Sequence, residues 1–261
     1  MPAMKVDLSG KVSLVTGAAR GIGEAIADEL AANGSRVVYA DCIDAGPAAS
    51  KSPGALALRM DVTNRAEIDA AIERTVKELG RLDILVNNAG VNTSKHRVAI
   101  DEFPRAEWDR LFAVDLTGLY EVSQAAARVM RLQKSGRIIN IASIVGLVPL
   151  RLQCAFAAAK AGVINLTKAM ALELGPCGIL VNGVAPGSIL TEVTRQLFYG
   201  SDGKFKDSAQ QLLAHVPLGR PGTTGEIAVA VLFLAAPENS YTHGHILTVD
   251  GGWTAGYARE F

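Results

Sequence analysis

Short runs rich in β-branched residues alternate with helical hydrophobic patterns along nearly the whole chain. The strand-like runs are almost continuously apolar, which is typical of parallel strands whose two faces are both covered. A helix between successive parallel strands indicates crossover connections on both sides of one sheet. We therefore expect one α/β domain, residues 1–261, built around a doubly wound parallel sheet of about seven strands. The runs expected to form strands are Val12–Thr16, Arg36–Asp41, Ala55–Asp61, Leu82–Asn87, Arg137–Ala142, Leu180–Val184 and Ile246–Val249.

Stretches with helical periodicity lie between these runs, and some carry a recognisable end signal. Asn33-Gly34 and Gly80 are typical of helix C-termini, since glycine readily adopts the left-handed backbone of the closing turn. The segment 191–222 breaks the alternation and shows only a weak helical pattern, and long irregular segments in compact domains are often functional. We expect a substrate lid at about residues 188–222. The expected helices are Ile22–Asn33, Arg65–Leu79, Pro104 to about Gln133, Cys154–Leu174 and Thr224–Leu234.

The charge balance and the cysteines exclude several classes of protein. Lysine plus arginine and aspartate plus glutamate each count 26, whereas nucleic-acid-binding domains are commonly basic. The uncharged run 174–191 contains two prolines and four glycines, so no membrane partner is expected. The N-terminus reaches Asp7 before an apolar segment forms, which argues against a signal peptide. Cys42, Cys154 and Cys177 lack metal-ligand spacing, so we expect free thiols, no metal site and a cytoplasmic location.

A glycine-rich turn lies between the first expected strand and the first expected helix. Gly17 permits a tight turn, and Gly21 and Gly23 allow the backbone to approach a pyrophosphate at the helix N-terminus. Arg20 and Ile22 occupy the positions between these glycines. A glycine triplet alone is weak evidence, but this one has the strand–turn–helix context that a dinucleotide site requires. We expect a dinucleotide cofactor, the alternative being a purely structural turn.

The second expected strand ends at Asp41, eighteen residues after Gly23. A carboxylate at this point accepts hydrogen bonds from the adenosine ribose hydroxyls and repels a 2′-phosphate. Arg20 acts in the opposite direction, because a basic side chain near the ribose favours NADP. Asp41 would contact the discriminating oxygen directly, so NAD is the expected cofactor.

Three further short motifs follow the glycine turn. They are Asp61-Val62, then Asn87-Asn88-Ala89-Gly90, then Pro186-Gly187 followed by Ile189 and Thr191. Together with the glycine turn, their order over residues 9–252 resembles the short-chain dehydrogenase/reductase family. The resemblance implies a Rossmann-type fold in which the first motif binds adenine, the second passes beneath the adenosine ribose and the third faces the nicotinamide.

Ser143 ends the fifth expected strand, and Lys160 follows seventeen residues later on the next helix. In the family that the chain resembles, a tyrosine precedes this lysine by four residues, on the same helical face. The ammonium group favours the ionised phenol, while the serine binds the reacting oxygen and the lysine holds the nicotinamide ribose. This chain has Phe156 there, whose ring carries no proton to exchange. Losing a general acid/base costs about 10²–10⁴-fold in rate, so we expect cofactor binding with poor turnover.

Three explanations for Phe156 stay open: an engineered Tyr→Phe change that traps a complex, a natural pseudoenzyme, and an acid/base supplied by another group. Asp115 is a second departure, because the family has asparagine there, and its main-chain carbonyl holds a water linking the lysine to solvent. Aspartate supplies the same carbonyl, so no large effect is expected. Its carboxylate would nevertheless stabilise the Lys160 cation and weaken the help that the lysine gives a phenol.

Substrate contacts are expected from three loops. His96 and Arg97 lie in the first, Gln153 with Arg151 precedes the helix of Phe156, and Glu192 lies in the lid. Their polarity favours a polyol, sugar alcohol or keto-sugar over a steroid or long acyl chain. His96 and Arg97 are equally consistent with solvated loop residues or subunit contacts.

The function predicted from these residues and this resemblance is an NAD-dependent oxidoreductase, weakened by Phe156. It would interconvert a secondary alcohol, as in a polyol or sugar alcohol, and its ketone by hydride transfer. One alternative is a non-catalytic NAD(H)-binding protein, and another is a dehydratase or epimerase on the same fold. The resemblance also implies a homotetramer, with no nucleic-acid partner.

Overall fold

A computed structural model of the chain describes residues 4–93, 96–200 and 206–256. Its strands are β1 (Val12–Thr16), β2 (Arg36–Asp41), β3 (Leu56–Arg59), β4 (Ile84–Asn87), β5 (Gly136–Ile141), β6 (Ile179–Pro186), β7 (Ile189–Leu190), β8 (Gly222–Thr223) and β9 (Ile246–Val249). Seven of them form one parallel sheet in the order β3-β2-β1-β4-β5-β6-β9. Successive strands are added outward from β1 on one side and from β4 on the other, so the sheet is doubly wound. The predicted class, a single Rossmann-type α/β domain, is confirmed.

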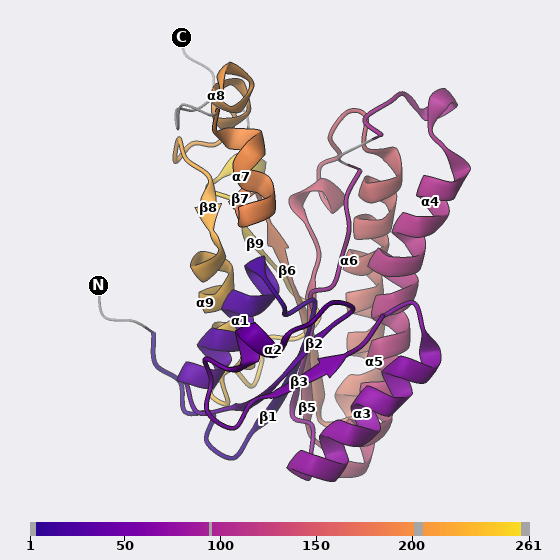
Figure 1. Cartoon of the computed structure of the whole chain (residues 1–261), viewed down its shortest axis with the longest axis vertical. Helices are drawn as coiled ribbons and strands as arrows, with labels where there is room; N and C mark the ends of the chain where they lie inside the picture. The colour runs from indigo at the N-terminus through magenta and orange to yellow at the C-terminus, as the bar shows by residue number, and fades with distance from the viewer. Residues whose placement is uncertain (1–3, 94–95, 201–205, 257–261) are drawn as a thin grey trace.

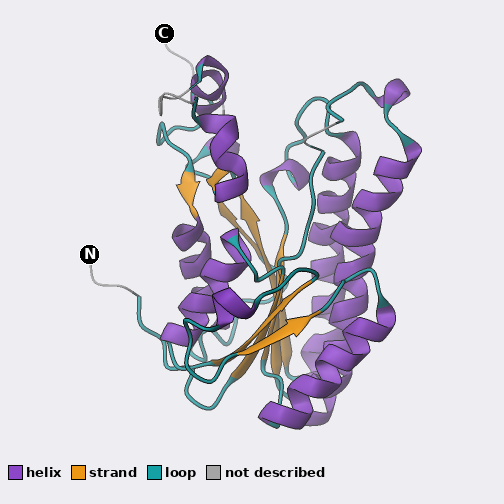
Figure 2. Cartoon of the chain, in the orientation of Figure 1, coloured by secondary structure: helices purple, strands orange, loops and turns teal. Residues whose placement is uncertain are grey.

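Helices cover both faces of this sheet, as Figures 1 and 2 show. They are α1 (Gly21–Ala32), α2 (Gly46–Ala49), α3 (Arg65–Leu79), α4 (Arg105–Phe112), α5 (Leu119–Gln133), α6 (Cys154–Leu174), α7 (Glu192–Phe198), α8 (Asp207–Leu213) and α9 (Thr224–Ala235). Leu14 of β1 packs in the core beneath α3, α5 and α6, whereas its neighbour Val15 packs beneath α1 and α9. Burial on both faces explains why this strand is apolar at successive positions. Within the described ranges, no helix is both long and apolar enough to cross a membrane.

The expected helix from Pro104 to about Gln133 is confirmed as one uninterrupted helical stretch, Arg105 to Gln133. It is not α-helical throughout, because the π-helical turn Ala113–Gly118 lies between α4 and α5. Gly118 lies against Val62, and a Cβ on it would approach the Val62 carbonyl oxygen to 2.8 Å. The wide turn therefore accommodates close packing between segments far apart in sequence, which periodicity along one helix does not reveal.

Two of the expected strands are too long, since the runs Ala55–Asp61 and Leu82–Asn87 pair only over β3 and β4. The segment 188–222 has more secondary structure than its sequence indicates. It contains α7 and α8, framed by the parallel pair β7 and β8, while residues 201–205 lie outside the described residues. Thr191 caps α7 by accepting the Thr194 N–H. The helices share a small apolar cluster that includes Phe198 and Leu213, whose sequence spacing hides the contact.

A chain of buried hydrogen bonds crosses the interior from β4 to α6. The Asn87 side-chain amide donates to Ser123 Oγ and to Asn140 Oδ1, and the Asn140 amide donates to Thr167 Oγ1 at 2.9 Å. The Thr167 hydroxyl then donates to the Val163 carbonyl. Because all these side chains are buried, each bond replaces contact with water that folding removed. The network ties the central strands to the helices that carry the candidate site.

Replacing Asn140 by alanine should lower the free energy of unfolding by about 2–3 kcal/mol, because it leaves buried polar partners unsatisfied. Urea unfolding, compared at constant m-value, measures this loss. Gln211→Ala, at an exposed position of α8, is the matched control and should change stability by less than about 0.5 kcal/mol. Equal effects of the two variants would contradict a structural role for the network.

Candidate active site

The glycine-rich turn is shaped by backbone packing that larger side chains would prevent. Gly17 and Gly21 have φ values of 65° and 67°, in the left-handed region that favours glycine. Gly23 lies so close to Gly17 that a Cβ on it would overlap the Gly17 carbonyl oxygen. The turn leads directly into α1, and because the first N–H groups of a helix have no intrahelical acceptor, this helix start fits an anion.

Asn88 holds this turn from the neighbouring strand end. Its side-chain amide donates to the carbonyls of Thr16 and Gly17, at 2.9 and 3.0 Å. In the other direction, Thr16 Oγ1 accepts the backbone N–H groups of Asn88 and Ala89, at 3.0 and 2.9 Å. These bonds join the carboxyl ends of β1 and β4, where the strand order reverses. Ligands of doubly wound sheets bind at that switch point.

Asp41 lies at the end of β2, beside the same turn. Its carboxylate accepts the N–H of Ala19 at 2.9 Å and the N–H of Ile43 at 3.2 Å. Arg20 is exposed at the N-cap position of α1. Arg20 and Asp41, which are expected to select between NADP and NAD, therefore lie at one turn. Backbone N–H groups hold the Asp41 carboxylate in place.

A hollow of about 450 Å³ opens beside Asp41, and sequence reasoning did not predict most of its lining. Its wall includes Cys42, Ile43 and Arg59, and Arg59 of β3 is in register with Asp41 of β2. The pairing of β2 with β3 brings Arg59 beside Asp41. The sequence pattern of either strand alone does not indicate that the two residues are neighbours. Asp61 follows β3 and accepts the N–H and hydroxyl of Thr63, at 2.8 and 2.7 Å.

The third motif lies near the glycine turn in space. Pro186 ends β6, and Gly187 packs so closely on Asp250 that a Cβ would lie 2.8 Å from its Cα. Thr191 Cγ2 lies 3.8 Å from the position that a Cβ on Gly21 would take. Ile189, in β7, is buried beneath the segment. The cofactor contacts expected of these residues stay predictions, and the structure brings the segment and the turn together.

Lys160 is buried on α6 and donates from Nζ to the Ile141 carbonyl at 3.1 Å. Asp115, in the wide turn, is 1% exposed, and its Oδ1 accepts the Val91 N–H at 2.8 Å. A Cβ on Gly90 would lie 3.0 Å from Asp115 Oδ1 and 3.5 Å from Lys160 Nζ. The two charged atoms are thus at most about 6.5 Å apart, the sum of those distances.

Burial raises the pKa of Asp115 above its ordinary value, although Lys160, the Val91 N–H and Arg110 each act to lower it. Asp115 Oδ2 is buried without a hydrogen-bond partner among the described residues. The cost of removing this carboxylate from water therefore exceeds the stabilisation that its neighbours supply.

Ser143 and Phe156 lie at the same end of the sheet. Ser143 follows β5, and its Oγ accepts the Val145 N–H at 3.2 Å. The Phe156 ring centroid is 5.8 Å from Lys160 Nζ, within the range of a cation–π contact. The ring packs into an apolar cluster with Leu150 and Trp253. Where a phenol is expected, the chain presents an apolar ring beside a buried cation.

The residues expected to contact substrate are not all brought together. Gln153 is buried at the N-cap of α6, one turn before Phe156. His96 instead turns its Nδ1 toward Glu107, at 3.8 Å, and Glu192 is exposed at the first position of α7. Of the three, Gln153 lies at the start of the helix that carries Phe156 and Lys160, and all three roles stay predictions.

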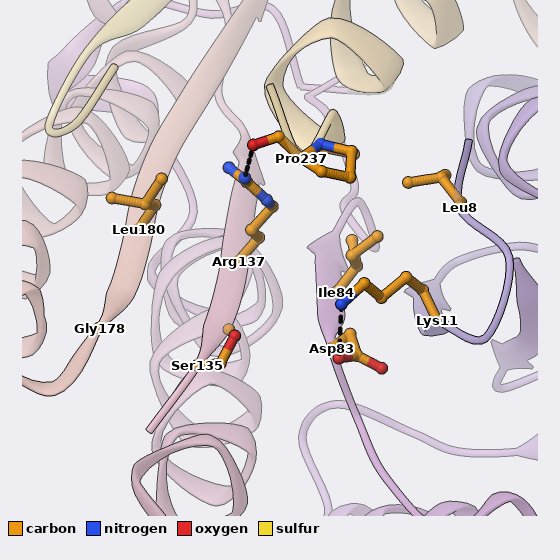
Figure 3. A pocket seen from close by; sticks show the side chains of 11 residues that line it. Leu8, Lys11, Asp83, Ile84, Ser135, Arg137, Gly178, Leu180 and Pro237 are labelled. Atoms are coloured by element: carbon orange, nitrogen blue, oxygen red, sulfur yellow. Dashed lines mark hydrogen bonds and ion pairs between the residues drawn. The ribbon is translucent and has the colours of Figure 1, made fainter. Parts of the chain in front are cut away.

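Figure 3 shows a second hollow, of about 150 Å³, at the amino ends of the strands. Its charged side chains already have partners: Lys11 lies 3.8 Å from Asp83, and Arg137 donates to the carbonyls of Pro237 and Asn239. Ligands of doubly wound sheets bind at the opposite, carboxyl ends of the strands, so this hollow is not the candidate cofactor site.

Comparisons with known proteins agree with this geometry. Residues 17–254 match a family model described as enoyl-(acyl carrier protein) reductase, of the adh_short_C2 type. A 3-oxoacyl-(acyl-carrier-protein) reductase FabG of Vibrio cholerae is 41% identical over 250 residues, covering 95% of this chain and 98% of that protein. A trans-4-hydroxycyclohexanecarboxylate dehydrogenase of Sinomonas cyclohexanicum is 41% identical over 258 residues, covering 94% of this chain and 93% of that protein.

A solved structure of a short-chain type dehydrogenase/reductase from Mycobacterium marinum superposes with a TM-score of 0.86 at 36% identity. That likeness covers 96% of this chain and 98% of the other. Sequence and fold therefore agree over nearly the whole length, and the chain belongs to the short-chain dehydrogenase/reductase family of oxidoreductases, which bind a nicotinamide cofactor.

Proposed function

We propose that the chain binds NAD and interconverts a secondary alcohol and its ketone, at a rate lowered by Phe156. The observation that carries this proposal is the buried Lys160 ammonium, 5.8 Å from an aromatic ring that lacks a hydroxyl. Ser143 lies at the same strand end and supplies a hydroxyl for the reacting oxygen. A bound nicotinamide would supply the site for hydride transfer, and the protein must supply the proton.

The turn fits a dinucleotide. Gly17 and Gly23 let the backbone close into a turn that a Cβ would block, and the N-terminus of α1 beside it favours the negative charge of a pyrophosphate. Asp41 supports the choice of NAD, because its backbone-held carboxylate stands where a 2′-phosphate would add negative charge. Asp61, Val62, Asn88, Ala89 and Gly90 would complete the adenosine side, with Pro186, Gly187, Ile189, Thr191 and Lys160 on the nicotinamide side.

The substrate is the finer part of the proposal. A polyol stays a prediction, whereas the partly buried side chains of Leu150, Phe156 and Trp253, which pack on one apolar cluster near Ser143, favour a substrate with an apolar carbon body. The named relatives, a 3-oxoacyl reductase and a hydroxycyclohexanecarboxylate dehydrogenase, support that second class. We therefore propose a hydroxy or keto acid derivative in preference to a sugar alcohol.

Other aspects of the sequence interpretation stay predictions. The origin of Phe156, engineered or natural, is one of them, and so are the homotetramer, the lid role of 188–222 and the cytoplasmic location. A non-catalytic NAD(H)-binding protein is the principal alternative, because the glycine turn and Asp41 do not depend on position 156. A dehydratase or epimerase would form product without net change of the cofactor.

Restoring the hydroxyl by Phe156→Tyr should raise the rate of alcohol oxidation or ketone reduction about 10²–10⁴-fold. Formation or loss of NADH measures the rate, over a panel of cyclic hydroxy acids, hydroxyacyl thioesters and polyols. Phe233→Tyr, an exposed position on α9, adds the same hydroxyl elsewhere and should leave the rate unchanged. If Phe156→Tyr raised the rate with no member of the panel, the result would contradict the proposed function and favour the non-catalytic alternative.

Asp41 should make NADH bind at least about tenfold more tightly than NADPH, because a 2′-phosphate would meet its negative charge. Fluorescence titration of the reduced dinucleotides gives both dissociation constants. Asp41→Ser should remove most of this preference, whereas Asp101→Ser, an exposed residue of the short helical turn Ile100–Glu102, should keep it. An unmodified chain that binds NADPH as tightly as NADH refutes the assignment.

A further inference from the structure

Asp115 brings a carboxylate into the candidate active site without a direct ionic partner. Its Oδ1 is held by the Val91 N–H at 2.8 Å, and Oδ2 is buried with no hydrogen bond to any described residue. A carboxylate accepts hydrogen bonds at about four lone-pair positions, so this group is poorly satisfied for an anion. Burial of this kind needs a compensating charge nearby.

Lys160 is the cation that faces this carboxylate from α6. Asp115 Oδ1 and Lys160 Nζ both lie beside Gly90, and the ammonium donates to the Ile141 carbonyl. The two charges therefore interact through a short gap of low dielectric, which is where a charge has the largest effect on its neighbours.

The remaining charged groups around Asp115 are already compensated. Arg110 comes from α4, and its guanidinium is paired with Glu107 at 2.8 Å. His96, from the loop after β4, lies on the far side of that glutamate, with Nδ1 at 3.8 Å from it. The Val91 N–H from the same loop is neutral. Lys160 is thus the uncompensated charge through which Asp115 acts on the site.

Lys160 in turn lies 5.8 Å from the ring centroid at position 156. An ammonium alone favours ionisation of a phenol at that position, whereas a carboxylate near the ammonium opposes it. At an effective dielectric constant near 20, a unit charge about 10 Å away shifts a pKa by roughly one unit. The combined field of the pair is therefore much weaker than that of the lysine alone.

We propose that Asp115 is a positioning residue that offsets the Lys160 charge, so that a phenol at position 156 keeps its proton and serves as the acid in ketone reduction. The inference rests on the proposed function. In that direction a bound reduced nicotinamide would supply a hydride to the carbonyl carbon, and the phenol would give its proton to the carbonyl oxygen, leaving alcohol, phenolate and oxidised cofactor. Removing the Asp115 charge should shift the balance toward the phenolate and toward alcohol oxidation.

The test compares Phe156→Tyr with the double variant Phe156→Tyr/Asp115→Asn. Asparagine keeps an oxygen for the Val91 N–H and removes only the charge. The ultraviolet titration difference between each Tyr variant and its Phe counterpart isolates the added phenol, without any need for turnover. Its pKa should be lower by about one unit in the Asn background. The acid limb of the pH–rate profile for alcohol oxidation should move down by the same amount.

Asp109→Asn, in the same Phe156→Tyr background, is the matched control. Asp109 is an exposed residue of α4 that pairs with Arg105, so its loss should leave the phenol titration unchanged. An unchanged or higher phenol pKa in the Asp115→Asn background would overturn the proposal. If the Phe156→Tyr chain is inactive, the proposed function fails, while the titration still decides the role of Asp115.

Thermal unfolding supplies a second measurement in the unmodified Phe156 chain. Because the folded-state pKa of Asp115 lies above its unfolded value, the protonated form stabilises the fold, and this is lost as pH rises through the folded pKa. Asparagine suffers no such loss, so the Tm of Asp115→Asn minus that of the parent should increase from about pH 4 to about pH 8. An Asn variant that fails to fold, or a difference that falls with pH, would contradict a poorly compensated buried carboxylate.

Discussion

The contact between Gly17 and Gly23 determines the architecture around it. Their backbones approach so closely that no side chain fits between them, and the Asn88 amide fastens the turn from the end of the adjacent strand. Through Thr16 the same bonds hold the ends of β1 and β4 together, at the point where the sheet reverses its order. The glycine-turn end of the cofactor site is therefore a consequence of strand packing, and its shape does not depend on the side chain at position 156.

The candidate catalytic end differs from this backbone-built site because it depends on side-chain charge. Lys160 is buried and donates to the Ile141 carbonyl. The Phe156 ring and the Asp115 carboxylate both lie near its ammonium group. An ammonium in such a place affects any group that exchanges a proton nearby, and Phe156 has none to exchange. In the proposed function, the site keeps a buried ammonium beside position 156 and lacks the hydroxyl that would exchange a proton there.

The sequence predicted most of the fold and the cofactor end, because both depend on local signals. Strand β1 and helix α3 match their predicted bounds, since an unbroken apolar run and a clear helical period with a terminal glycine are readable in one segment. The π-helical turn at Asp115 and the helices of the segment 188–222 were not predicted in that form, because contacts between distant segments produce them. Arg59 beside Asp41 and the orientation of His96 toward Glu107 are likewise results of tertiary packing.

The proposed function requires an intact cofactor site beside a proton-transfer position that Phe156 disables. Calorimetric titration with NADH, for the unmodified chain and for Phe156→Tyr at one pH, tests that separation most directly. The account predicts dissociation constants that agree within about twofold, since neither the glycine turn nor Asp41 involves position 156. Loss of NADH binding in the unmodified chain, with recovery in the tyrosine variant, would contradict it, because the two ends of the site would then not be independent.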